Sequence, residues 1–191
     1  MSVSSEAILE RFAQIVANSL RIDASRVVND ACLNDLGAES LDLLEITMEA
    51  EDAFSILIPQ KTILQTAQEV YGAGVLETDG HLTEFAQAML RSRLPDQLWS
   101  SLPERPTVAD VNRLFLRVQT WVWMIAGLVE HTPNACSQCG APFGKKAIAG
   151  RLKCPACAAE HELVPGEELN RRWVQRYQQE CGPSAPTVPA A

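Results

Sequence analysis

Hydrophobic residues between positions 40 and 54 recur at steps of three and four, which is the spacing of an amphipathic helix. Acidic residues fall mainly between them, and no Lys or Arg occurs from Val27 to Gln60. The pattern predicts a helix that begins at Ser40 and has one apolar side and one acidic side. Its apolar residues are Leu41, Leu43, Leu44, Ile46, Met48, Ala50 and Phe54.

The same spacing predicts further helices on both sides of this one. They cover residues 6–20, 62–71, 83–94, about 107–129 and 167–180. Ser4 or Ser5 is suited to cap the first, Thr107 is suited to cap the fourth, and Gly72 and Gly74 end the second. We therefore expect a mainly α-helical fold.

The helix expected from 107 to 129 is unusually apolar and rich in Trp. Trp121 and Met124 either pack in the core or form an exposed patch for a partner or an acyl chain. Because Trp and Met at helical spacing usually pack against other side chains, we favour the core interpretation. Before this helix, prolines bracket a loop that carries Leu98 and Trp99.

Ser40 follows a loop that contains Gly37, a residue that lets the backbone turn without hindrance from a side chain. At the start of a helix, the Ser40 hydroxyl lies beside free backbone N–H groups and the positive end of the helix dipole. Both would stabilise an attached phosphate. Serine is also a common N-cap, so a purely structural role for Ser40 is the alternative.

The sequence Asp-Leu-Gly-Ala-Glu-Ser-Leu-Asp at 35–42 resembles the prosthetic-group loop of acyl carrier proteins. The resemblance includes the following helix and its exit loop; it covers about residues 6–59 and, more weakly, 106–116. In that family the serine carries 4'-phosphopantetheine through a phosphodiester, so the resemblance implies that Ser40 is the attachment site. Family members usually have Asp before the serine, where this chain has Glu39.

The resemblance implies an acyl-carrier-like four-helix bundle over residues 1–130, with an inserted segment at 60–105. It implies a carrier rather than an enzyme. Such a carrier would be modified by a phosphopantetheinyl transferase, hold acyl intermediates as thioesters, and deliver them to fatty-acid, lipid or polyketide-type enzymes. The docking residues expected around Ser40 are Asp35, Glu39, Leu41, Asp42, Glu45 and Glu49.

The net charge of −8 is unevenly placed: residues 1–130 carry 19 acidic and 9 basic side chains, and residues 131–191 carry 5 and 7. An acidic front half disfavours nucleic acid as a partner and favours docking onto basic protein surfaces. The most apolar segment, 114–129, is interrupted by Arg117 and is too short to span a bilayer. Because the N-terminus lacks a basic start and an apolar run, we expect no secretory signal and a cytoplasmic protein.

Four of the six cysteines form two CxxC pairs, Cys136 with Cys139 and Cys154 with Cys157. Each pair can form a tight turn, and four thiolates satisfy a tetrahedral Zn²⁺. We therefore expect a zinc ribbon at 131–166, with a structural role because four ligands leave no open coordination position. A rubredoxin-like iron site has the same ligands, and redox-active thiols are a further alternative.

The remaining C-terminal residues, 167–191, are expected to form a helix followed by a disordered tail rich in Pro and Ala. Trp173 and Tyr177 share the apolar side of that helix. His161 fits an exposed ribbon position better than a spare metal ligand.

A second hypothesis belongs to a different class of function. The chain could be a zinc-ribbon module for protein interaction or regulation, with a non-functional carrier domain. An enzyme is the weakest reading, because the sequence offers no Ser/His/Asp order, no open metal site and no phosphate-cradling glycine loop. The mass of the purified protein, with and without a transferase, separates a carrier from an interaction module.

Overall fold

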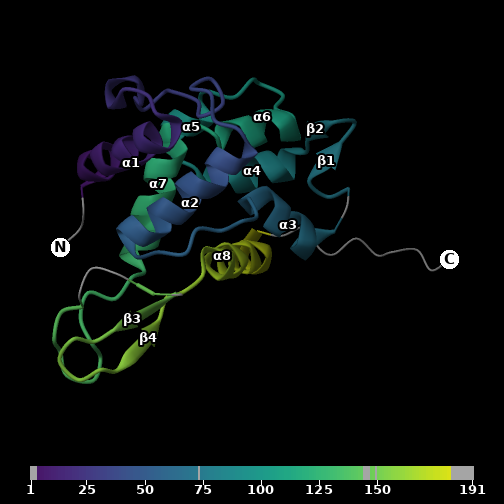
Figure 1. The fold of residues 1–191 in the computed structure, drawn as a ribbon. Coiled ribbons are helices and arrows are strands. Elements are labelled where there is room, and N and C mark those ends of the chain that lie inside the picture. Colours follow the sequence, from purple (N-terminus) through teal and green to yellow (C-terminus); the bar gives the residue numbers. More distant parts are fainter. Residues whose placement is uncertain (1–3, 73, 144–146, 149, 182–191) are drawn as a thin grey trace.

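The computed structural model describes residues 4–72, 74–143, 147–148 and 150–181, and the tail expected at 182–191 lies outside them. The described part is mainly helical, with a small cysteine-containing module at one end (Figure 1). Its α-helices are α1 (Ser5–Leu20), α2 (Ser40–Phe54), α3 (Ile63–Tyr71), α4 (Glu84–Arg93), α5 (Asp96–Trp99), α6 (Val108–Leu114), α7 (Val118–Glu130) and α8 (Gly166–Cys181). Its strands are β1 (Glu77–Thr78), β2 (His81–Leu82), β3 (Arg151–Lys153) and β4 (Glu160–Glu162).

Hydroxyl side chains set the starts of several helices, and those at Ser4 and Thr107 agree with the caps expected from the sequence. The Ser4 hydroxyl accepts a hydrogen bond from the Ala7 backbone N–H and so caps α1. Thr62, Thr83 and Thr107 cap α3, α4 and α6 in the same way. Each cap satisfies a backbone N–H that the first turn of a helix leaves without a partner.

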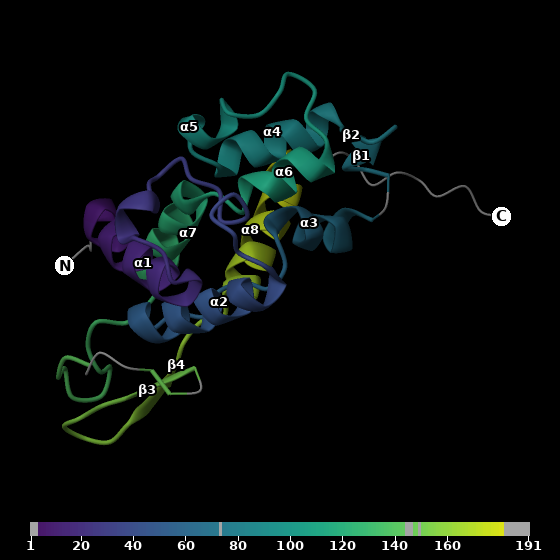
Figure 2. The same ribbon diagram turned by 45° about the horizontal axis from the view of Figure 1, so that its top comes forward.

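The first hydrophobic core lies between α1, α2 and α7 (Figures 1 and 2). Phe12 of α1 and Trp121 of α7 stack there, with ring centroids 5.2 Å apart. Trp121 is buried, and Met124 is partly buried against the same cluster. The prediction that this apolar helix packs as core is therefore confirmed.

The second hydrophobic core is built from α3, the β1–β2 hairpin, α4, α5, α6 and α8. Helix α8 packs against α3, and Val174 at its centre is fully buried. The Arg93 guanidinium lies over the rings of Trp123 and Trp173, at 4.9 and 5.8 Å from their centroids. The segment expected as an insertion thus has a core of its own, which α6 and α8 complete.

The single helix expected over about 107–129 is wrong, because α6 ends at Leu114 and α7 begins at Val118. Leu114 packs in the second core and Val118 in the first, so the break lies where the chain passes between the two. The loop after α1 binds the backbone groups that the break exposes. Leu33 N–H donates to Leu116 C=O at 2.9 Å, and Val118 N–H donates to Ala31 C=O at 3.0 Å.

Two small elements fall where the sequence suggested only loops. Strands β1 and β2 form a hairpin whose turn residues, Asp79 and Gly80, both have positive φ, as a type I′ turn requires. The proline-bracketed loop contains α5, where Leu98 is buried in the second core.

The described residues between 131 and 165 form the cysteine-containing module, called the ribbon below. Its strands β3 and β4 pair antiparallel, with Leu152 opposite His161. The ribbon lies beside the C-terminal half of α2 and leads directly into α8 (Figure 2).

Candidate functional site

Ser40 is exposed and is the first residue of α2. The N-cap position belongs to Glu39, whose backbone N–H donates to the Asp42 carboxylate at 2.8 Å. The alternative that Ser40 itself is the N-cap is therefore wrong. Its hydroxyl projects from the first helical turn, where backbone N–H groups lack partners within the helix.

The loop before Ser40 is anchored to the first core. Leu33 and Ala38 are buried, and Ala38 N–H donates to Leu33 C=O at 2.9 Å. Between them, Gly37 has a φ of +100°, a conformation that residues with a Cβ rarely adopt. The loop is thus held at both ends while Glu39 and Ser40 remain exposed.

Three of the expected docking residues present exposed side chains beside Ser40. Leu41 is 80 % exposed, an unusual degree for a large apolar side chain. Glu39 and Glu49 are also exposed.

The other three expected docking residues already contact neighbours. Asp35 lies 3.8 Å from the Arg113 guanidinium, and both side chains are largely exposed. Asp42 accepts the hydrogen bond at the start of α2, and Glu45 accepts one from the Ser19 hydroxyl at 3.1 Å. An exposed pair such as Asp35–Arg113 contributes roughly 0–1 kcal/mol, so it can open readily.

Glu51 has a structural role that the sequence pattern did not reveal. Its carboxylate accepts a hydrogen bond from Ile58 N–H at 2.8 Å and so holds the exit loop, residues 55–60, against α2. Burial raises the pKa of Glu51, although the Ile58 hydrogen bond acts in the opposite direction. The acidic side of α2 therefore includes a carboxylate that serves the fold.

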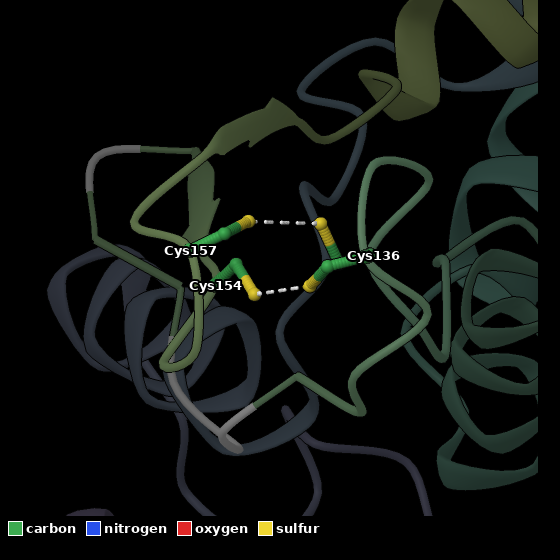
Figure 3. Close-up of side chains that lie close together, drawn as sticks. Cys136, Cys154 and Cys157 are labelled. Carbon is green, nitrogen blue, oxygen red and sulfur yellow. Dashed lines mark hydrogen bonds between the residues drawn. The ribbon is translucent and has the colours of Figure 1, made fainter.

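The four cysteines of the two CxxC pairs come together in the ribbon. Their sulfurs all lie within 4.8 Å of one another. The sulfurs of Cys136 and Cys157 are 3.6 Å apart, and those of Cys139 and Cys154 are 3.5 Å apart (Figure 3). Zn–S bonds of about 2.3 Å in a tetrahedron place sulfurs roughly 3.8 Å apart, so the cluster fits a zinc ribbon.

The two CxxC turns have the same backbone form. Gly140 N–H donates to Cys136 C=O at 2.9 Å, and Ala158 N–H donates to Cys154 C=O at 3.0 Å. Gly140 and Ala158 both have positive φ, 73° and 60°. The second turn therefore places an alanine in a conformation that glycine adopts more readily.

The environment of Cys154 favours a thiolate. Backbone N–H groups of Cys157 and Ala156 point at its sulfur and, together with hydrogen bonds from the Cys139 and Cys157 side chains, lower the pKa of Cys154 to about 6. Although a backbone hydrogen bond from Ala159 acts in the opposite direction, the neighbouring thiols in turn raise the pKa of Cys157. Metal ions bind the thiolate form, so this backbone geometry suits a ligand.

His161 lies next to the sulfur cluster rather than at an exposed position. Its Nε2 is 3.3 Å from the Cys136 sulfur, and its ring makes an edge contact with Phe143. The side chain is half-buried. His161 therefore adds a nitrogen at hydrogen-bond distance from one of the four sulfurs. The four sulfurs alone are sufficient as ligands for a tetrahedral metal ion.

A comparison with known families bears on the part of the chain that contains Ser40. Residues 10–73 match the family described as phosphopantetheine attachment site, a span that includes most of α1 and all of α2 and α3. The match supports the resemblance to acyl carrier proteins and supports a phosphopantetheine carrier. No solved structure matches the chain. Every helix in the described part of the chain is too short or too polar to cross a membrane.

Proposed function

We propose that this protein is an acyl carrier whose 4'-phosphopantetheine is attached to Ser40. The observation that carries the proposal is the position of Ser40. It is an exposed hydroxyl on the first turn of α2, behind a loop anchored to the core, and it lies within the residues that match the phosphopantetheine-attachment family.

The chain's own groups suit such an attachment. On modification, the Ser40 Oγ loses its proton and bonds to the pantetheine-side phosphorus of coenzyme A, while the P–O bond of the pyrophosphate breaks and adenosine 3',5'-bisphosphate leaves. The free N–H groups and dipole of the first turn of α2 favour the phosphate charge. Because Glu39 and Asp42 cap the helix, Ser40 is not needed for that role. When bound, the group supplies a thiol that holds an acyl chain as a thioester.

The acidic side of α2 is proposed as the docking surface for the transferase and for acyl-handling enzymes. The docking surface comprises Asp35 and Glu39 of the preceding loop and Leu41, Asp42, Glu45 and Glu49 of α2. Complementary charge mainly raises the rate of encounter and sets orientation. The proposed partners are cytoplasmic enzymes of fatty-acid, lipid or polyketide type.

A structural Zn²⁺ is proposed at Cys136, Cys139, Cys154 and Cys157. The fit of the sulfur separations to a tetrahedron and the thiolate-favouring turn at Cys154 support it. Four sulfur ligands saturate the ion, so the proposed role is to hold the ribbon rather than to catalyse.

The decisive experiment is intact mass measurement after incubation with coenzyme A and an active phosphopantetheinyl transferase. Wild type is expected to gain the mass of one phosphopantetheine, and Ser40→Ala is expected to gain none. Ser25→Ala, which removes another exposed serine hydroxyl, serves as the matched control and should be modified like wild type. A wild-type chain that resists several active transferases, or modification of Ser40→Ala, would contradict the proposal.

A further inference from the structure

An exposed apolar stripe runs along α2 on the side away from the first core. Leu41, Leu44 and Met48 are 80 %, 55 % and 61 % exposed. On the opposite side of the helix, Ile46 and Ala50 are fully buried. Exposed apolar residues that cluster in this way mark a binding surface more often than chance.

The ribbon turns this stripe into one side of a groove. The groove is open to solvent along one side and has a volume of about 620 Å³. The exit loop contributes Ile56 and Leu57, and the ribbon contributes Gly150 and Leu163 as the facing wall. We call this cavity the α2–ribbon groove.

Close contacts fix the ribbon wall in place. Gly166 N–H donates to Leu57 C=O at 2.9 Å. A Cβ on Gly166 would lie 2.4 Å from Pro59, so only glycine allows this approach. A Cβ on Gly150 would lie 3.2 Å from the Leu57 side chain. These contacts set the exit loop of α2 against Gly150 of the ribbon and against the start of α8.

Ser40 lies at the edge of the groove. Ser40, Leu44 and Met48 are spaced four residues apart, so they share one face of α2. The lining residues extend from Leu41 to the far end of the helix, a distance of about 16 Å at 1.5 Å per residue. A group attached to Ser40 therefore begins where the groove begins.

We propose that the α2–ribbon groove receives the acylated pantetheine arm attached to Ser40, an inference that rests on the proposed function. The arm carries amide and hydroxyl donors, and the carboxylates of Glu45 and Glu49 line the groove near Ser40. The acyl chain beyond the thioester is apolar, and apolar residues, Ile56, Leu57 and Leu163, line the far end of the groove.

The tether favours this occupant over a partner's peptide. A chain attached at Ser40 samples the groove at a high effective concentration, whereas a separate partner must bind from solution. Each methylene buried in the groove raises the equilibrium constant for binding there by roughly a factor of four, so a long acyl chain binds more strongly than a short one. A basic amphipathic segment of a partner is the competing occupant, and the experiment below distinguishes it.

The test compares acetyl and dodecanoyl thioesters loaded onto Ser40. Their rates of cleavage by hydroxylamine are measured against the corresponding free pantetheine thioesters. In wild type, the dodecanoyl thioester should be protected at least about fivefold more than the acetyl thioester. The double variant Leu44→Gln, Met48→Gln should lose most of that difference, because both side chains are exposed and line the groove. Val28→Gln is the matched control, since Val28 is 49 % exposed but lies outside the groove, and it should keep the protection.

NMR chemical shifts locate the chain independently of its reactivity. Loading dodecanoyl in place of acetyl should shift signals of Gly150 and Leu163 in the groove wall. Shifts confined to the first core, at Val16 and Ile46, would overturn the proposal. Equal protection of the dodecanoyl thioester in wild type and in the double variant would also overturn it. If the double variant keeps that protection but weakens acyl transfer by partner enzymes, the groove binds a partner instead, and the proposal is likewise overturned.

Failure of this proposal is separable from failure of the proposed function. A chain that gains no pantetheine in the mass measurement contradicts the carrier itself. Complete loading on Ser40 without chain-length-dependent protection leaves the carrier standing and overturns the groove alone.

Discussion

The helical part of the molecule and the ribbon are stabilised in different ways. The helical part has two clusters of buried apolar side chains, one around Phe12 and Trp121 and one around Met89 and Leu90. Among the described residues of the ribbon, the buried ones are Cys136, Leu152, Cys154 and Leu163. Half of these are proposed metal ligands. With so little apolar burial, we expect the ribbon to depend on the proposed metal for its stability, whereas the helical part should not.

The sharpest way to break this comparison is to remove one ligand. In Cys154→Ser, metal binding should be lost and the ribbon should unfold while the helices persist, because structural zinc supplies on the order of 10 kcal/mol to small zinc domains. Metal content per chain and hydrogen exchange, resolved by residue, measure the two effects. Cys181→Ser, at an exposed cysteine outside the cluster, is the control. If the ribbon stays folded without metal, it does not differ from the helical part in what stabilises it.

The reverse experiment weakens the helical part. Trp121→Ala removes a buried ring that stacks on Phe12 and should reduce the free energy of unfolding by about 3–5 kcal/mol. Denaturant titration followed by circular dichroism measures the change. Leu41→Ala, at an 80 % exposed position, should be close to neutral. Metal binding should survive Trp121→Ala in the absence of denaturant; if it does not, the two parts fold as one unit.

A smaller effect concerns the two CxxC turns. Each has a residue in the left-handed backbone conformation, but that residue is Gly140 in the first turn and Ala158 in the second. Ala158→Gly should stabilise the ribbon by roughly 1 kcal/mol, because glycine adopts a φ of 60° without the steric cost that a Cβ brings. Gly140→Ala should destabilise it by a similar amount. Competition with a metal chelator measures both variants. Equal chelator resistance in all three proteins would show that the turn conformation does not limit ribbon stability.

The smallest expected effect is at Ser40. Ser40→Ala should change the stability of the helical part by less than about 0.5 kcal/mol, because Glu39 holds the N-cap position. Thr62→Ala provides the comparison, since the Thr62 hydroxyl caps α3, and its loss should cost about 1 kcal/mol. Thermal unfolding measures both. A larger loss for Ser40→Ala than for Thr62→Ala would assign Ser40 a structural role.

Local signals in the sequence were sufficient for most helices. The period of the apolar residues gave the extent of α1 and α2, and hydroxyl residues marked the starts of α1 and α6. The two CxxC turns were predicted from spacing, and their sulfurs do meet. In each case the determining residues are neighbours in sequence, so the pattern contains the information.

The break between α6 and α7 could not be predicted in this way. Leu114, Phe115 and Leu116 are all compatible with a continuing helix. The chain turns there because its two halves pack in different cores and because Ala31 and Leu33 bind the exposed backbone groups. The groove could not be predicted from the sequence either, since α2 and Leu163 are brought together only by the packing of the ribbon on the exit loop.

The pairing of Leu33 with Leu116 has a consequence for how the molecule assembles. It joins the loop that presents Ser40 to a segment far along the chain, and the first core is completed by α7, beyond the residues that match the phosphopantetheine-attachment family. Contacts of such long sequence separation form late, because the chain must first close a large loop. During synthesis, α1 and α2 therefore leave the ribosome long before their packing partner, and Ser40 reaches its final setting only after α7 has emerged.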